Sequence, residues 1–340
     1  MRRFMAAVAC VCFILPASAQ WQIQMSGTDV QLRGISAVSD RIAWASGAKG
    51  TVLRTVDGGK TWTKVTVPDA QALDFRDIQA FDQDTAFILS IGPSEQSRIY
   101  KTVDGGKNWQ LQFTNKDPKA FYDCFSFWDS KHGIAVSDSV DGKFPLLSTS
   151  DGATWSPVAV KSMPAALPNE GAFAASGTCI ATGGKKDVWF GTGGPAARVF
   201  HSSDRGANWT AAKTPIIHGA SSQGIFSVLF WTRRSGVAVG GDYKEPGKTD
   251  GTAAFTHNGG KTWSLAKHQP AGYRSAVDAV GSMFVAVGTN GVDSSNTGES
   301  WHRLHEYNLN AISFARLDAG WAVGAEGTIF RYTIHPHGTD

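Results

Sequence analysis

Thr55-Val56-Asp57-Gly58-Gly59-Lys60-Thr61-Trp62 is the stretch of sequence that decides the fold, because close copies of it recur along the chain. The other copies are Thr102–Trp109, Ser150–Trp155, Ser202–Trp209, Thr256–Trp263 and Ser294–Trp301. Their final tryptophans follow one another at intervals of 38 to 54 residues. Six occurrences at this spacing indicate a repeat architecture, in which each repeat is one small structural unit.

The residue types of the motif suit a β-hairpin. The Asp or Asn side chain can accept hydrogen bonds from the turn backbone, and glycine adopts positive φ without strain. The tryptophan that follows can bury a large ring. The motif resembles the Asp-box, or bacterial neuraminidase repeat, which builds hairpins and is not catalytic. We therefore expect Asp57 and Asp104 to shape turns and not to bind a ligand.

Four short strands can be traced around each copy of the motif, which is typical of a propeller blade. The strands expected to come first in each unit are 35–38, 78–81, 124–127, 173–175, 226–230, 276–280 and 312–314. The seventh unit lacks the motif and a fourth strand, whereas Trp21–Gln24 resembles a fourth strand without a blade. The sequence thus predicts an all-β, seven-bladed β-propeller over residues 20–334, closed by its N-terminal strand.

The N-terminus has the features of a signal peptide. Arg2 and Arg3 precede the apolar run Phe4–Leu15, and Ala17-Ser18-Ala19 offers small residues for cleavage after Ala19. We expect residues 1–19 to be removed and the protein to be exported, to the periplasm or outside the cell. No other stretch is long and apolar enough for stable membrane insertion. Residues 335–340 are expected to form a C-terminal tail.

Charge and cysteine content narrow the function classes. Without Arg2 and Arg3, 30 basic residues face 29 acidic ones, and this balance argues against a nucleic-acid-binding protein. Cys124 and Cys179 remain after cleavage. They are compatible with one disulfide in an oxidising compartment, but the interpretation we favour is two separate, buried apolar side chains. The sequence does not indicate an oligomeric state.

Propellers usually bind ligands where the inner strands begin. Aligning the residues just before each first strand brings together Arg33, Arg76, Tyr122 and Arg274. Three arginines at equivalent positions would form a basic patch suited to carboxylates or phosphates; alternatively, each pairs with a local acid. Long connections in the middle repeats add the candidate binding residues Asp141, Lys143 and Tyr243, because connections often carry function.

Acidic residues on the same connections support an alternative function. Asp123, Asp138 and Asp242 could supply the pair of carboxylates that glycoside hydrolysis requires. A sialidase would also need a tyrosine nucleophile, and Tyr122, Tyr243 and Tyr273 are present. The Arg-Ile-Pro motif of many sialidase propellers is missing, and those enzymes generally have six blades. The interpretation that we favour for each acid is a solvated loop residue or a turn cap.

The sequence shows no cofactor or metal site. The histidines lack the regular spacing of metal ligands, and Gly191-Thr192-Gly193-Gly194 ends a strand instead of opening a helix, as a nucleotide-binding loop would. We therefore expect neither a cofactor nor a metal.

Taken together, the repeated motif, the signal peptide and inner strands such as Gly320-Trp321-Ala322-Val323-Gly324 resemble the photosystem II assembly and stability factor family. The resemblance extends over nearly all of residues 20–333. It is especially near to members from non-photosynthetic bacteria, sometimes labelled oxidoreductases, in Phe121–Phe125, Asp141–Pro145 and Phe173–Cys179. It implies a non-enzymatic propeller that binds a protein partner through an arginine-rich face, to which Arg33, Arg76 and Arg274 would belong. A carbohydrate-active propeller that binds glycans is the alternative.

Overall fold

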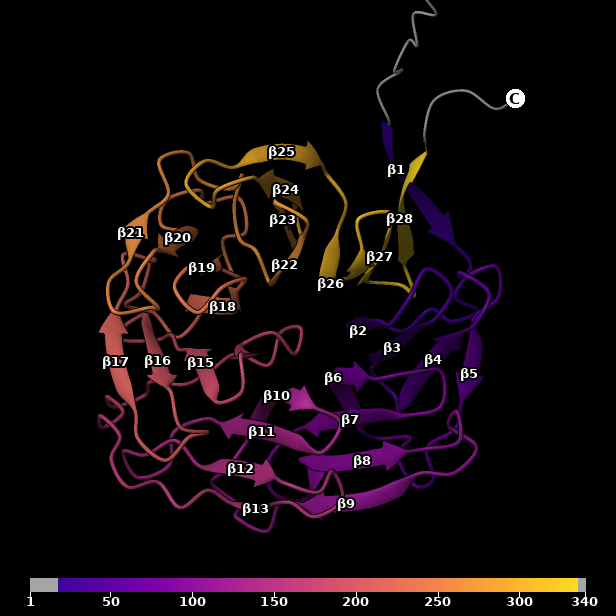
Figure 1. Ribbon diagram of the computed structural model, residues 1–340, viewed down its shortest axis with the longest axis horizontal. Helices are drawn as coiled ribbons and strands as arrows, with labels where there is room; N and C mark the ends of the chain where they lie inside the picture. The colour runs from indigo at the N-terminus through magenta and orange to yellow at the C-terminus, as the bar shows by residue number, and fades with distance from the viewer. Residues whose placement is uncertain (1–17, 336–340) are drawn as a thin grey trace, which may run out of the picture.

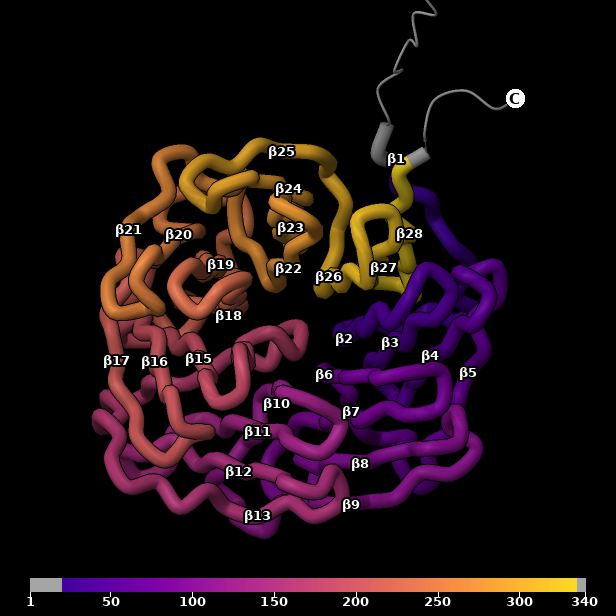
Figure 2. Tube along the Cα trace, viewed as in Figure 1, coloured from indigo at the N-terminus to yellow at the C-terminus, as the bar shows by residue number. Residues whose placement is uncertain are grey.

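The computed structural model describes residues 18–335, and it contains seven antiparallel sheets of four strands each. The chain makes one circuit, so that the sheets stand as blades around a common centre (Figures 1 and 2). Within the described residues, the single helical element is the short 3-10 helix η1 (Ser94–Gln96). No helix of residues 18–335 is long and apolar enough to cross a membrane. The predicted all-β, seven-bladed propeller is confirmed.

The first four blades follow the chain in order, with the innermost strand given first. Blade 1 contains β2 (Leu32–Ala37), β3 (Ala43–Gly47), β4 (Thr51–Thr55) and β5 (Thr63–Val65). Blade 2 contains β6 (Asp74–Ala80), β7 (Ala86–Ile91), β8 (Arg98–Thr102) and β9 (Gln110–Thr114). Blade 3 contains β10 (Tyr122–Asp129), β11 (His132–Ser137), β12 (Leu146–Thr149) and β13 (Ser156–Pro157). Blade 4 contains β14 (Ile180–Gly183), β15 (Asp187–Gly191), β16 (Arg198–Ser202) and β17 (Thr210–Lys213).

The last three blades complete the circuit. Blade 5 contains β18 (Gln223–Phe230), β19 (Gly236–Asp242), β20 (Ala253–Thr256) and β21 (Ser264–Leu265). Blade 6 contains β22 (Ala276–Val280), β23 (Met283–Gly288), β24 (Gly291–Ser295) and β25 (His302–His305). Blade 7 contains β26 (Leu309–Arg316), β27 (Ala319–Gly324), β28 (Ile329–His335) and β1 (Ser18–Gln24).

Blade 7 combines both ends of the described chain, as the sequence predicted. Strand β1 pairs antiparallel with β28, and Trp21 lies opposite Tyr332 (Figure 1). The side chain of Gln24 accepts hydrogen bonds from the indoles of Trp321 in blade 7, at 3.1 Å, and Trp62 in blade 1, at 3.0 Å. The N-terminal strand thus completes one blade and also fastens it to the next. The predicted signal peptide lies outside the described residues except for Ser18 and Ala19, which begin β1; residues 336–340 of the predicted tail also lie outside.

The repeated motif forms the turn that follows the third strand in each of blades 1 to 6. In blade 1, the Asp57 carboxylate accepts hydrogen bonds from the backbone N–H and the hydroxyl of Thr61, at 3.0 and 2.7 Å. These bonds lower the pKa of Asp57 to about 2. The Thr55 hydroxyl accepts a bond from the Gly59 N–H at 2.8 Å. The side-chain oxygens of Thr55 and Asp57 are therefore engaged within the turn itself.

Hydrogen bonds between inner strands join all seven blades around the centre. In six interfaces, a side-chain oxygen of one blade accepts a backbone N–H of the next, at 2.7 to 3.2 Å. The donor and acceptor residues are Ala80 to Ser36, Phe125 to Asp77, Thr182 to Ser126, Val277 to Ser227, Phe314 to Asp278 and Ala37 to Ser313. The seventh interface is joined by the hydroxyls of Thr178 and Ser227, 2.7 Å apart. We call these bonds the inter-blade ring.

The fastening role of β1 predicts unequal effects for two of its side chains. Trp21 packs edge-on against Tyr332, with ring centroids 5.3 Å apart, whereas Ile23 is 71% exposed. We expect Trp21→Ala to lower the free energy of unfolding by about 2 kcal/mol, because a half-buried ring loses its contacts. Ile23→Ala should change it by less than about 0.5 kcal/mol. Urea denaturation measures both, and equal effects would contradict the closure described here.

The inter-blade ring predicts a pH dependence of stability. Burial raises the pKa of Asp278 to about 6, although the N–H groups of Phe314 and Ala279 partly oppose the rise. The folded protein therefore holds this proton more tightly than the unfolded chain, and the resulting stability declines as the pH rises from about 4 to about 6. The free energy of unfolding of Asp278→Asn, relative to that of wild type, should therefore be higher near pH 7 than near pH 4, by up to about 3 kcal/mol. Urea denaturation giving the same difference at both pH values would contradict this assignment.

Candidate functional site

A cavity of about 550 Å³ lies where the inner strands of several blades begin. Its charged lining residues are Arg33, Arg76, Asp123 and Asp138, and its aromatic ones are Phe121, Phe173, Phe226, Tyr243 and Tyr273. The lining includes residues of β2, β6, β10 and β18 together with the segment that precedes β14. The cavity thus belongs to the ring as a whole and not to one blade.

β-bulges determine which side chains reach the cavity. In blades 1, 2, 3, 5 and 7, the pairing of the inner strand with its neighbour skips one residue near the start of the strand, and in the first four of these blades that residue lines the cavity. The residues skipped in these four blades are Arg33, Arg76, Asp123 and Phe226. An extra residue in one strand interrupts the alternation of faces and redirects a side chain. The predicted placement of Arg33 and Arg76 on one face agrees with the structure.

The same bulges show that the predicted position of Tyr122 was wrong by one residue. Tyr122 is buried among the apolar side chains between blades 2 and 3, where its ring packs against Phe113. The following residue, Asp123, lies at the bulge and lines the cavity. A shift of one residue turns every side chain of a strand to the opposite face. A single sequence does not show where the pairing of two strands skips a residue, so the shift at Tyr122 could not be predicted.

Arg274 does not contribute to the cavity either. Its side chain is fully buried, and its Nε donates a hydrogen bond to the Asp293 carboxylate at 2.6 Å. Gly288 closely approaches the Arg274 backbone, just as Gly47 approaches Leu32 in blade 1. Arg274 therefore occupies a core position like that of Leu32 in blade 1, and the local acid accounts for its charge. The predicted patch of three arginines is reduced to Arg33 and Arg76.

The segment before β14 forms one wall of the cavity. Residues 173–175, predicted as the first strand of the fourth unit, are not a strand; β14 begins at Ile180. Gly177 interrupts the extended backbone with a φ of 79°. The ring of Phe173 instead stacks on Phe226, with centroids 3.9 Å apart. The carbonyls of Ala174 and Ala175 face the arginines, so the segment supplies hydrogen-bond acceptors to the cavity.

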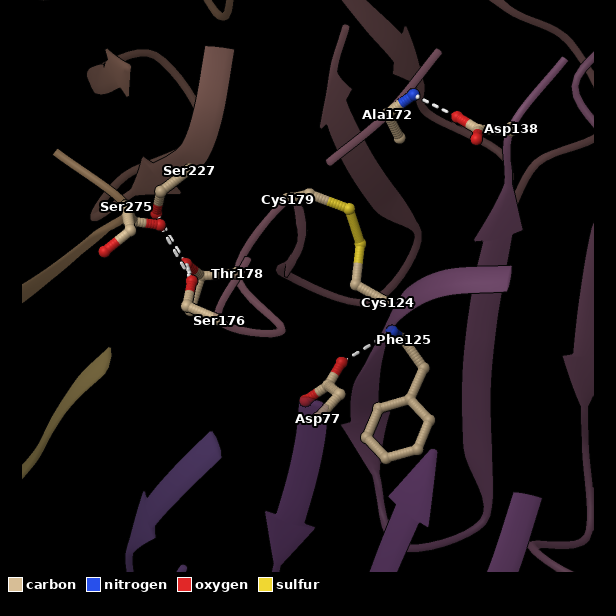
Figure 3. The surroundings of a disulfide bond; sticks show 10 residues. All are labelled: Asp77, Cys124, Phe125, Asp138, Ala172, Ser176, Thr178, Cys179, Ser227 and Ser275. Atoms are coloured by element: carbon tan, nitrogen blue, oxygen red, sulfur yellow. Dashed lines mark hydrogen bonds between the residues drawn. A yellow bond between two sulfur atoms is a disulfide. The ribbon is translucent and has the colours of Figure 1, made fainter. Parts of the chain in front are cut away.

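Two strong contacts fix this segment in place. Cys124 of β10 and Cys179 form a disulfide, with Cα atoms 6.2 Å apart (Figure 3). The favoured interpretation of two separate thiols is therefore wrong: the bulge beside Cys124 and the turn at Gly177 bring the two residues together. At the other end of the segment, Arg198 Nε donates to the fully buried Glu170 carboxylate at 2.7 Å. The cavity wall is consequently tied to blades 3 and 4.

The two arginines of the cavity differ in their partners. Arg76 donates from Nε to Asp74 at 2.8 Å and from Nη1 to the Ala174 carbonyl at 2.9 Å. Arg33 donates to the Ala175 carbonyl at 3.4 Å, and its buried Nε has no hydrogen-bond partner among the described residues. Burial and the nearby charge of Arg76 lower the pKa of Arg33. An anion beside Arg33 would stabilise the charged guanidinium and so oppose both effects on its pKa.

Two carboxyl groups line the same cavity. Asp123 is 1% exposed, and burial raises its pKa well above the usual range, assisted by the charge of Asp138. Burial also raises the pKa of Asp138 to about 6, although its Oδ1 accepts the Ala172 N–H at 3.0 Å (Figure 3). The two groups titrate as a coupled pair, which retains a proton more readily than two isolated carboxylates.

The remaining predicted residues divide between the cavity and its surroundings. Tyr243 lines the cavity and is 47% exposed. Asp141 and Lys143 are exposed outside it, and Asp141 pairs with Lys119 at 3.1 Å. Asp242 is buried outside the lining, where Gln223 Nε2 and the Lys244 N–H donate to its carboxylate. The structure thus brings Asp123 and Asp138 together and leaves Asp242 apart.

The aromatic residues that form one wall of the cavity were not predicted from the sequence. Phe173, Phe226 and Tyr273 lie together, and Tyr273 packs edge-on against Phe226 with centroids 4.7 Å apart. Phe226 shares the bulge position of Arg33, so a correct alignment of inner strands would have found it. No sequence signal of comparable strength identifies Phe173, because its role depends on the path of an irregular segment. Within residues 18–335, no group of three or more metal-ligating side chains occurs.

Comparison with known proteins supports the fold. No protein-family model and no curated protein sequence matches the chain. The solved structure named YCF48 bound to D1 peptide is 16% identical, with a TM-score of 0.64, and the match covers 96% of this chain and all of the other. YCF48 from Cyanidioschyzon merolae is 18% identical, with a TM-score of 0.61 and coverage of 94% and 99%. U3-55K is 11% identical, with a TM-score of 0.63 and coverage of 92% and 98%. The expected resemblance to photosystem II assembly factors is confirmed for the fold.

The disulfide predicts how the cavity wall responds to reduction. Cys124 and Cys179 are separated by 55 residues in sequence, and loss of a crosslink of this length costs about 2–4 kcal/mol of stability. We expect the double variant Cys124→Ala/Cys179→Ala to lose this amount in urea denaturation. Relative to wild type, hydrogen exchange in the variant should accelerate more in residues 171–178 than in the outer strands of blade 4. Unchanged stability and unchanged exchange would contradict the clamping role.

Proposed function

We propose that this chain is an exported, non-enzymatic propeller that binds a segment of another protein in the cavity, in an assembly or scaffold role. The observation that carries the proposal is Arg33, a cavity arginine with no acidic partner among the described residues, facing a wall of aromatic side chains. Arginine binds carboxylates through directed, charge-assisted hydrogen bonds. Aromatic rings supply contact area to an apolar neighbour on the same segment.

Two further observations support the proposal. A structure of similar fold is described as bound to a peptide, which supports peptide binding by a propeller of this kind. Export to the periplasm or outside the cell is supported by the N-terminal sequence and by the Cys124–Cys179 disulfide, because disulfides persist in oxidising compartments. The segment that enters the cavity should carry an acidic side chain or a free C-terminal carboxylate.

Peptide selection tests the proposed function. Random linear peptides displayed on phage are selected on the full chain, and the affinities of the enriched peptides are measured by fluorescence polarisation. We expect acidic residues to be enriched, and Arg33→Glu to weaken binding at least about tenfold, since a charge-assisted bond becomes a repulsion. Lys143→Glu, a charge reversal at an exposed residue outside the cavity, should leave affinity unchanged. Absence of enriched peptides, or equal effects of both variants, would contradict the proposal.

A carbohydrate-active enzyme is the second candidate function, because Asp123 and Asp138 share a cavity and burial raises the pKa of both. A glycosidase needs one protonated and one ionised carboxyl group near the scissile bond. This candidate predicts turnover of a member of a glycan panel and its loss in Asp123→Asn. Turnover that Asp123→Asn and Asp138→Asn leave intact would exclude this pair as the catalytic groups.

A further inference from the structure

The carboxyl pair in the cavity has unused capacity to accept hydrogen bonds. Asp123 is 1% exposed, it lines the cavity, and its Oδ2 has no partner among the described residues. An unpaired buried polar atom is costly, and native structures usually provide a partner for it. Asp138, half-buried beside it, uses Oδ1 to accept the Ala172 N–H. A ligand group that donates hydrogen bonds would therefore supply the partner that Asp123 Oδ2 lacks.

The charged groups around Asp123 and Asp138 do not supply this missing partner. The other ionisable groups on the elements that line or adjoin the cavity include Arg33, Asp74, Arg76, Asp77, Tyr122, Glu170, Tyr243 and Tyr273. Arg76 is near enough to oppose the rise in the pKa of Asp123, but its guanidinium is engaged by Asp74 and the Ala174 carbonyl. Glu170 is engaged by Arg198, and Asp77 by the Phe125 N–H. No cation of the described residues forms an ion pair with Asp123 or Asp138.

We propose that the Asp123–Asp138 pair binds a protonated amine or guanidinium of the same segment whose acidic group contacts Arg33. The cavity then recognises a peptide that carries one acidic and one basic side chain at nearby positions. This inference rests on the proposed function and deepens it, because it defines the chemistry of the segment. The aromatic wall between the two charged regions would contact apolar parts of the same peptide.

The proposed contact couples binding to proton release. Without ligand, burial raises the pKa of Asp138 to about 6 and raises the pKa of Asp123 well above its usual range, so the pair is partly protonated near pH 6. A bound cation favours the ionised carboxylates and lowers both pKa values. The ligand therefore displaces a proton, and its affinity increases as the pH rises through about 6.

Peptide selection with matched variants tests the recognition. Phage-displayed random peptides are selected in parallel on wild type, Asp123→Asn, Asp138→Asn and Asp141→Asn. The last removes an exposed carboxylate outside the cavity and is the control. We expect wild type and Asp141→Asn to enrich peptides with both an acidic and a basic residue. The two cavity variants should retain the acidic preference and lose the basic one. Selection of the same sequences by all four proteins would overturn the inference.

Calorimetry provides a second, independent readout. An enriched peptide is titrated near pH 6 in phosphate and in Tris, two buffers whose enthalpies of ionisation differ, so that the difference in heat reports protons released. We expect release with wild type and none with the double variant Asp123→Asn/Asp138→Asn, which keeps neither carboxyl group of the pair. The peptide with norleucine in place of lysine should bind at least about tenfold more weakly than the lysine peptide to wild type, whereas the double variant should bind both peptides equally. No proton release, or equal loss in both proteins, would overturn the inference.

The outcomes separate this inference from the proposed function. If acidic peptides bind in an Arg33-dependent manner without any basic preference, peptide binding stands and the role of the carboxyl pair is wrong. If no peptide is enriched, both fail. If instead a neutral glycan binds and depends on Asp123, the pair donates or accepts hydrogen bonds to hydroxyl groups, and the proposal of a cationic ligand is contradicted.

Discussion

The inter-blade ring is the interaction on which the rest of this structure depends. A single four-stranded blade exposes two edges and too little apolar surface to be stable by itself. Six of the seven neighbouring pairs of blades are joined through a side-chain oxygen and a backbone N–H, and the seventh through two hydroxyls, which fixes the relative height and rotation of the blades. The interface between blades 7 and 1 is joined at the centre by Ala37 and Ser313, and at the outer side by Gln24 of β1, which contacts Trp62 and Trp321.

This constraint also explains why a cavity forms where it does. Because the inner strands are held in common register, the bulged residue of one strand lies at the same end of the ring as that of the next. A bulge turns one side chain away from the alternation of its strand. Arg33, Arg76, Asp123 and Phe226 thus meet at the cavity, although they are far apart in the sequence. The same register leaves Arg274 in the core, paired with Asp293.

The architecture could be predicted from the sequence because its signals are local. The repeated motif contains its own turn chemistry, as the bonds among Thr55, Asp57 and Thr61 show, and the unpaired strand Trp21–Gln24 implied closure. The site was predicted only in part. Arg33 and Arg76 were identified, but Tyr122 lies one residue before the bulge position, and Arg274 is buried against Asp293. A bulge leaves little trace in a single sequence, and so does the irregular path that brings Cys179 to Cys124.

We propose that the chain binds its partner in the cavity, through Arg33 on one side and the Asp123–Asp138 pair on the other. A crystal structure of the full chain with a selected peptide tests it most directly. We expect density for the peptide in the cavity, with an acidic group that contacts Arg33 and a basic group within hydrogen-bond distance of Asp123 or Asp138. A peptide bound instead to the outer strands of a blade, with the cavity unchanged, would contradict it.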